Sequence, residues 1–163
     1  MQMITKQSFM STRAIKFLNG RNASFDIVKY DHVQKGAAFA SRAVGFSLGK
    51  TIKTLVVKLD EKRFALALMP GDRELDLKRM AKACRVKKAA MAGPDEAERL
   101  TGYQVGGISP FGTKASLPCV MENGLLGHDT AIINAGQRGV MLKMSPADIA
   151  RLLDCTAADI ARK

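Results

Sequence analysis

Apolar residues recur along the chain with two periods, which separate the expected strands from the expected helices. Runs that alternate apolar and polar residues, or that are rich in β-branched residues, are typical of strands. Such runs occupy residues 25–30, 51–59, 64–69, 118–121, 130–135 and 140–143. Apolar positions three and four residues apart predict amphipathic helices. These helices are expected near residues 12–20, 37–44, 77–84, 94–100 and 146–153.

The order of these elements predicts the fold class. Residues 51–59 and 64–69 flank the polar segment 60–63, which is typical of a β-hairpin. Strands interrupted by helices, without regular strand–helix–strand alternation, favour an α+β fold with a mixed or antiparallel sheet. No internal repeat, low-complexity tract or linker divides the chain. We therefore expect a single domain over residues 12–163, preceded by a short disordered or added lead over residues 1–11.

Composition narrows the class of protein. Of the 163 residues, 47% are hydrophobic, yet no apolar run approaches the 18 residues typical of a membrane span. Three cysteines without CxxC spacing or an export signal argue against a disulfide framework, so we expect a cytoplasmic protein whose cysteines are ordinary small residues. The two histidines, His32 and His128, have no second ligand at metal-site spacing. The sequence thus predicts neither a metal nor a cofactor.

The chain carries a large positive charge. Its 26 Lys and Arg against 15 Asp and Glu give a net charge of +11, which favours a polyanionic partner. Four basic residues fall on or just after the helix expected at 77–84, namely Lys78, Arg79, Lys82 and Arg85. Such a face fits a nucleic-acid backbone. An ordinary solvated helix face is the alternative.

Residues 102–112 (GYQVGGISPFG) form the most distinctive segment. Glycine permits positive φ and close approach of another molecule, while proline fixes its own φ and favours an extended residue before it. Such a loop can present free amide N–H groups to an oxyanion or a phosphate. A tight connection between a helix and a strand is the alternative. The segment contains no GxSxG nucleophile motif, phosphate-loop motif or dinucleotide motif.

Two further side chains are candidates for the wall of a cleft. Lys53 interrupts the apolar strand at 51–59, where a lysine can line a cleft or simply point outward from a half-exposed strand. Tyr30 ends the strand at 25–30 and can form a hydrogen bond in the same cleft or lie at the edge of the core.

Four blocks of the sequence carry a resemblance to a known family. The blocks are Tyr30-Asp31-His32, residues 52–57 (IKTLVV), residues 75–82 (LDLKRMAK) and residues 101–112 (TGYQVGGISPFG). In order and spacing they resemble the YbaK/EbsC family, free-standing relatives of the bacterial prolyl-tRNA synthetase editing domain, and the glycine block is the most specific. The chain looks nearest to the YbaK group of Cys-tRNA(Pro) deacylases, and it departs from their pattern around residues 33–42.

The resemblance implies a fold and a set of site residues. The fold is a mixed, largely antiparallel β-barrel-like sheet surrounded by helices, without a metal. Lys53 corresponds to the family's essential strand lysine, and Gly106 and Gly107 begin its GxxxP loop, whose amides would stabilise an oxyanion. The resemblance also implies a substrate pocket formed by Tyr30, Ile108, Ser109 and Pro110. Lys78, Arg79, Lys82 and Arg85 would then contact the tRNA acceptor stem.

These observations lead to one principal hypothesis and two alternatives. The principal hypothesis is a trans-editing deacylase that removes a mischarged amino acid, with cysteine favoured, from tRNA(Pro) by attack of the substrate thiol or of water. Its partners are the acceptor end of aminoacyl-tRNA and, through the resemblance, prolyl-tRNA synthetase. One alternative is a non-catalytic module that binds tRNA or the synthetase. The other is a sister deacylase that acts on alanyl- or seryl-tRNA.

Overall fold

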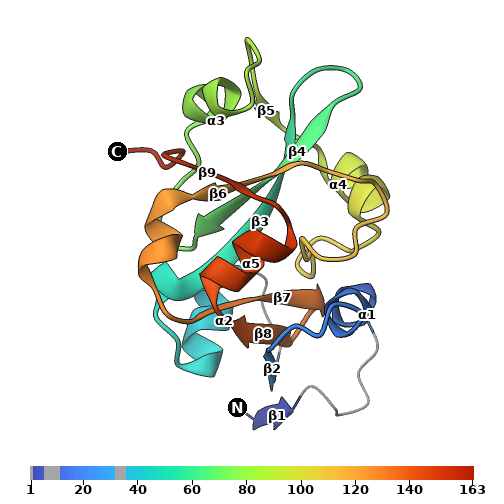
Figure 1. Cartoon of the computed structure of the whole chain (residues 1–163), viewed down its shortest axis with the longest axis vertical. Coiled ribbons are helices and arrows are strands. Elements are labelled where there is room, and N and C mark those ends of the chain that lie inside the picture. Colours follow the sequence, from blue (N-terminus) through green and yellow to red (C-terminus); the bar gives the residue numbers. More distant parts are fainter. Residues whose placement is uncertain (1, 6–11, 32–35) are drawn as a thin grey trace.

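A computed structural model describes residues 2–5, 12–31 and 36–163 of the chain. Within these residues the helices and strands alternate irregularly (Figure 1). The α-helices are α1(Arg13–Asn19), α2(Ala37–Val44), α3(Leu77–Ala83), α4(Pro94–Thr101) and α5(Pro146–Leu152), and two 3₁₀ turns are η1(Leu48–Lys50) and η2(Asn123–Gly127). The strands are β1(Gln2–Thr5), β2(Asp26–Lys29), β3(Thr51–Lys58), β4(Phe64–Pro70), β5(Ala90–Met91), β6(Cys119–Glu122), β7(Ala131–Gln137), β8(Val140–Met144) and β9(Thr156–Ala158).

All the described strands belong to one mixed sheet. Its order is β1-β2-β8-β7-β3-β4-β6-β9, with β5 pairing β3 beside this path. The pairs β3·β7, β4·β6 and β6·β9 are parallel, and the remaining described pairs are antiparallel. The predicted α+β class with a mixed, largely antiparallel sheet is therefore confirmed. No pairing joins β1 to β9 among the described strands, so the sheet is open at these two ends.

Helices cover the sheet on both faces. Strand β4 is continuously apolar because it contributes side chains to the core on each face. Phe64, Leu66 and Leu68 face one core cluster, whereas Ala65, Ala67 and Met69 face another, which also contains Met80 of α3. Every residue of β4 is consequently buried. Figure 1 shows α5 in front of the sheet and places α3 and α4 on opposite sides of the β3–β4 hairpin.

The helix ends follow the capping signals in the sequence. Thr12, Asp76 and Ser145 each accept a hydrogen bond from a main-chain N–H in the first turn of α1, α3 and α5. Helix α2 ends at Gly45, whose φ of 72° lies in the left-handed region that glycine adopts readily. The five predicted helices and six predicted strands are all present, with small shifts at their ends.

Three short strands were not predicted. Strands β5 and β9 lie at sheet edges, and residues 156 and 157 of β9 are exposed, so their sequence has no buried-face pattern. Strand β1 pairs antiparallel with β2 inside the segment 1–11 that the sequence predicted to be a lead. Residues 6–11 lie outside the described residues, and the boundary at residue 12 stays a prediction.

None of the described helices is long and apolar enough to cross a membrane.

Candidate active site

The candidate site lies where strand β3 loses a neighbour. Strand β7 pairs in parallel with only the first two residues of β3, at Thr51 and Ile52. On the same edge, β5 pairs antiparallel with the last two residues, at Val57 and Lys58. Between these pairings the sheet is open along residues 53–55, because the carbonyl of Val56 accepts a hydrogen bond from Ala92 N. A gap of this kind leaves main-chain hydrogen-bonding groups available to a bound molecule.

A cavity of about 330 Å³ follows this unpaired edge. Every residue of β3 from 51 to 56 contributes to its wall, including both the residues that face one side of the sheet and those that face the other. The cavity therefore follows the edge and is reached from both faces of the strand. Its wall is mostly apolar, and the polar side chains in it belong to Tyr30, Thr51, Lys53, Thr54 and Asn134.

Among the described residues of the cavity wall, Lys53 is the positively charged one. It is the first residue of the unpaired stretch of β3 and is half-buried. In the part of the chain that the structure describes, no carboxylate forms an ion pair with it. The predicted cleft lysine thus lines a cavity. A half-buried cation without an internal counter-ion is suited to bind an anionic group of a ligand.

Tyr30 directly follows β2 and lines the cavity. Its main-chain N–H donates a hydrogen bond to the carbonyl of Gly139, and its ring centroid lies 6.1 Å from that of Phe39 on α2. Burial raises the pKa of the Tyr30 hydroxyl above its usual value. The side chain is therefore a neutral hydrogen-bonding group. His32, the last residue of the Tyr30-Asp31-His32 motif, lies outside the described residues.

The glycine segment reaches the cavity through Val105, Gly106 and Ile108. Gly106 has a φ of 94°, and its carbonyl accepts a hydrogen bond of 3.4 Å from Asn134 Nδ2 on β7. No hydrogen bond occupies the Gly106 N–H among the described residues. A donor beside a mostly apolar cavity is what the oxyanion hypothesis requires.

The prediction for Gly107 needs correction. Its N–H donates to the carbonyl of Gln104 at 2.8 Å and is therefore not free to bind an oxyanion. Gly107 also lies against the β7–β8 turn, where a Cβ atom would come within 3.0 Å of Arg138 N. This glycine permits close packing of the loop on the sheet, the role that the tight-connection alternative assigned to the segment.

Ser109 and Pro110 are buried but do not line the cavity. Ser109 Oγ accepts a hydrogen bond from Phe111 N at 3.3 Å, so this hydroxyl organises the turn. Of the four residues predicted for the substrate pocket, the cavity brings together only Tyr30 and Ile108.

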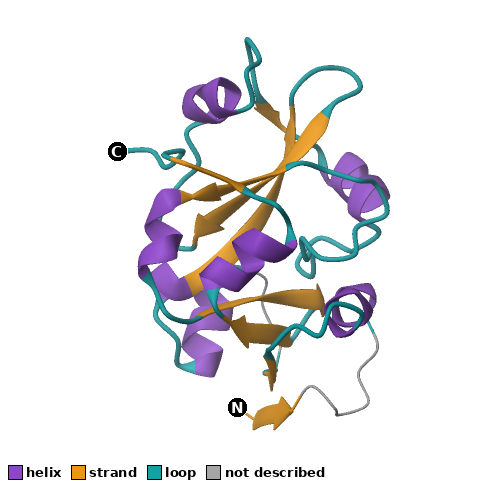
Figure 2. Cartoon of the chain, viewed as in Figure 1, coloured by secondary structure: helices purple, strands orange, loops and turns teal. Residues whose placement is uncertain are grey.

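Several contacts fix the glycine segment beside β3. Arg138 donates to the carbonyl of Val105 through Nε and Nη2 at 3.1 and 2.7 Å, and Val105 N donates to Glu98 on α4. The buried Tyr103 hydroxyl donates to the carbonyl of Phe111, and burial raises the pKa of Tyr103 to about 12. Figure 2 shows the resulting loop folded between α4 and α1.

Replacing Gly136 with alanine is expected to destabilise the protein by about 2 kcal/mol. Gly136 has a φ of 95°, and a Cβ atom there would lie 2.6 Å from the ring of Tyr103. Thermal or urea unfolding measures the change. Gly127→Ala is the control, because nothing lies within 4 Å of a Cβ atom at that position. Equal stability of the two variants would contradict this assignment.

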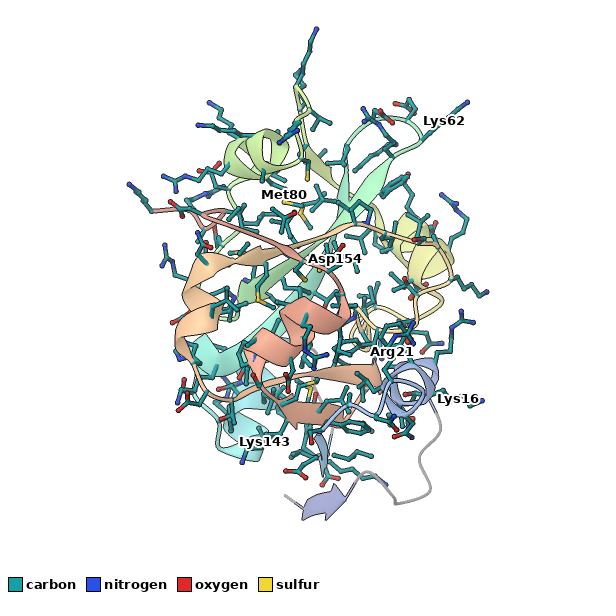
Figure 3. The ribbon with its side chains drawn as sticks, viewed as in Figure 1. Lys16, Arg21, Lys62, Met80, Lys143 and Asp154 are labelled. Atoms are coloured by element: carbon teal, nitrogen blue, oxygen red, sulfur yellow. The ribbon has the colours of Figure 1, made fainter. Side chains whose placement is uncertain are left out.

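The predicted basic residues are not part of the cavity wall. Lys78, Lys82 and Arg85 are exposed on and after α3. Arg79 is half-buried and forms ion pairs with Asp159 and Asp76, so its charge is already neutralised within the protein. Positive charge is also spread widely over the surface. Figure 3 shows Lys16, Lys62 and Lys143 projecting outward from different sides of the molecule.

The cysteines are free and lie outside the cavity wall. Cys119 is buried, and Cys84 and Cys155 are half-buried. Burial raises the pKa of the Cys84 thiol. Across the described residues, no group of three or more His, Cys, Asp or Glu is arranged to hold a metal ion.

Sequence reasoning missed three polar residues of the cavity, Thr51, Thr54 and Asn134. Asn134 Oδ1 accepts hydrogen bonds from Gly136 N and Gln137 N at 2.7 and 3.1 Å, while its Nδ2 reaches Gly106. It thereby links the irregular end of β7 to the glycine segment. A local sequence pattern contains no signal for this contact, because the two segments are 28 residues apart.

Fold and cavity together define a class of protein whose described site residues are a cleft lysine, main-chain groups and neutral side chains. Comparison with known proteins identifies the family to which the chain belongs. Residues 33–152 match the family described as the aminoacyl-tRNA editing domain. The chain belongs to this aminoacyl-tRNA editing domain family, as the YbaK/EbsC resemblance of its motifs predicted, and its activity is that of an aminoacyl-tRNA deacylase.

Two curated relatives cover nearly the whole chain. A candidate Cys-tRNA(Pro)/Cys-tRNA(Cys) deacylase, EbsC of Enterococcus faecalis, is 30% identical over 99% of this chain and 99% of its own length. The multifunctional Ser/Thr-tRNA deacylase ProXp-y of Escherichia coli K12 is 30% identical over 93% of each chain. A crystal structure of a candidate trans-editing enzyme for prolyl-tRNA synthetase matches with a TM-score of 0.85 and 26% identity, covering 94% of this chain and 99% of that one.

Proposed function

We propose that this protein is a trans-editing deacylase that removes a mischarged amino acid from tRNA(Pro) in the cytoplasm. The observation that carries the proposal is the cavity on the unpaired edge of β3, where Lys53 and the glycine segment converge in a member of an editing family. The likeness to a candidate trans-editing enzyme for prolyl-tRNA synthetase supports tRNA(Pro) as the substrate and the synthetase as a partner.

The roles of the cavity residues follow from the chemistry of the ester. An aminoacyl ester is already labile, so the site needs mainly to hold the 3′ end and stabilise the oxyanion that forms at the carbonyl. We assign oxyanion stabilisation to the N–H of Gly106. Lys53 binds the terminal ribose-phosphate through its charge. Tyr30 and Ile108 bound the space for the amino acid.

The identity of the amino acid depends on the nucleophile. For a cysteinyl ester, the substrate thiol can attack its own carbonyl, forming a carbon–sulfur bond while the ester C–O bond to tRNA breaks and the thiol proton passes to the departing ribose oxygen. This route suits a cavity in which the described residues supply no strong base, and the relative EbsC is named for cysteinyl substrates. The relative ProXp-y is named for seryl and threonyl substrates. For these esters, and for alanyl esters, a positioned water must be the nucleophile.

The test is the rate of ester loss from a panel of charged tRNA(Pro) molecules. Cysteinyl, alanyl, seryl and threonyl esters are compared, with the purified protein and without it. Accelerated loss of the cysteinyl ester supports thiol attack, and preference for seryl or threonyl esters indicates a water-dependent sister specificity. A protein that binds tRNA but accelerates no ester loss is the non-catalytic module of the alternative hypothesis, and this outcome overturns the proposal.

The basic face of α3 is proposed to guide the acceptor stem. Replacing Lys82 with alanine is expected to weaken tRNA binding and to reduce the slope of log affinity against log salt by about one, because one phosphate contact is lost. Binding titrations at several salt concentrations measure the slope. The matched control is Lys16→Ala on α1, another exposed lysine at a distance from α3. Equal slopes for the two variants would show that Lys82 on α3 does not contact the tRNA.

A further inference from the structure

Two threonines of β3 line the cavity but differ in their hydrogen bonds. Thr51 Oγ1 donates to the carbonyl of Ser47 at 2.9 Å. Thr54 Oγ1 is buried, yet it has no hydrogen-bond partner among the described residues. A buried hydroxyl without a partner costs free energy, and such groups in a native fold call for an explanation. The hydroxyl of Thr54 is therefore a candidate for a group that pairs with a ligand.

The main chain of Thr54 faces the same space. The carbonyl of Thr51 accepts a hydrogen bond from Gly71 N at the end of β4, so it is directed toward β4. The carbonyl of Val56 accepts from Ala92 N, on the opposite edge of β3. Because main-chain groups alternate along a strand, the carbonyl and N–H of Thr54 share the direction of Val56 and lie on the unpaired edge. Thr54 thus offers two oxygen acceptors beside the cavity.

The charged residues near the cavity limit how a cationic group can be held beside these acceptors. No carboxylate lines the cavity, and the residues outside the described part contain no Asp or Glu. A cationic group bound here must accordingly be held by neutral oxygens. Lys53 and Thr54 are consecutive on β3, so their side chains point to opposite faces of the sheet. An ammonium group bound on the Thr54 side is kept away from the charge of Lys53.

We propose that Thr54 is the residue that binds the α-ammonium group of the aminoacyl ester, through its hydroxyl and its main-chain carbonyl. This inference rests on the proposed function and deepens it, because it divides the cavity into two ends. The ammonium group lies on the Thr54 side, and the ribose-phosphate lies on the Lys53 side. The ester carbonyl between them faces the N–H of Gly106.

The test uses Thr54→Val, which keeps the shape of the side chain and removes its hydroxyl. Its kcat/KM for the best substrate of the panel is expected to fall about tenfold or more, since a hydrogen bond to a charged group is lost. Thr54→Ser keeps the hydroxyl and is expected to stay within about threefold of the wild type. The melting temperature of Thr54→Val is expected to equal or exceed that of the wild type. Thr51→Val removes the hydroxyl that donates to the carbonyl of Ser47 and is expected to lower the melting temperature.

A second substrate separates binding of the ammonium group from a general effect on the site. The same aminoacyl-tRNA with its α-amino group acetylated carries no positive charge there. Thr54→Val is expected to reduce kcat/KM for the free amine but to leave that for the acetylated substrate within about twofold. Equal losses on both substrates, or a drop in melting temperature like that of Thr51→Val, would assign Thr54 a structural role and overturn the inference.

The two proposals fail in different ways. If the wild-type protein cleaves the ester and Thr54→Val cleaves it equally well, only the inference on Thr54 is wrong. If the wild-type protein accelerates no ester loss, the proposed function is wrong and the inference falls with it.

Discussion

Replacing Glu122 with leucine is expected to lower the free energy of unfolding by about 4 kcal/mol, the largest stability loss that we expect from a single substitution. Glu122 ends β6 and is only 7% exposed. Its Oε1 accepts hydrogen bonds from Ile160 N and Ala161 N at 3.0 and 3.1 Å, and its Oε2 accepts from Gly124 N at 2.7 Å. Leucine fills the space but leaves these main-chain donors without an acceptor.

Two variants show whether the loss comes from the hydrogen bonds. Glu122→Gln keeps one acceptor oxygen and is expected to lose about half as much as the leucine variant. Glu74→Gln removes a carboxylate that pairs with Arg162 on the same C-terminal segment, but this pair is exposed and its loss is expected to cost less than about 1 kcal/mol. Urea unfolding followed by circular dichroism measures all three. A leucine variant as stable as Glu74→Gln would show that the buried carboxylate does not hold the C-terminal segment.

The elements that the sequence predicted best are those whose burial follows a local pattern. Strand β4 is apolar throughout because both of its faces are covered. Helix α3 begins after its N-cap Asp76 and buries Met80 and Ala81 on one face. Strands β5 and β9 escaped prediction because the neighbouring strand, and not their own side chains, determines them. Main-chain pairing at a sheet edge leaves no periodic signal in the sequence.

The candidate site was predictable in its residue types but not in its geometry. Lys53 could be selected because a charged residue interrupts an apolar strand, yet its place on an unpaired edge depends on where β7 and β5 begin and end. The glycine segment was recognisable, but its sequence could not show that the N–H of Gly107 is already bound to Gln104. Thr54 resembles any strand threonine until its missing partner is seen in three dimensions.

Replacing Lys53 with methionine is expected to reduce kcat/KM for deacylation at least about a hundredfold, the largest effect on activity that we expect. Methionine keeps most of the length and apolar character of the side chain while removing its charge. Because no ion pair to Lys53 is present among the described residues, stability is expected to be unchanged or slightly higher. Ester loss is measured on the panel of charged tRNA(Pro), and urea unfolding on the same samples.

The same strand provides a matched control for Lys53. Lys58→Met also removes one charge from β3, but Lys58 pairs with Glu96 and Glu61 outside the cavity. This variant is expected to keep its activity within about twofold and to lose a little stability. Equal activity of the Lys53 and Lys58 variants would show that the charge in the cavity is not used, and the site would then have to act through main-chain groups alone. If only Lys53→Met loses deacylation activity, catalysis at the open edge of β3 requires a positive charge next to the unpaired main-chain groups.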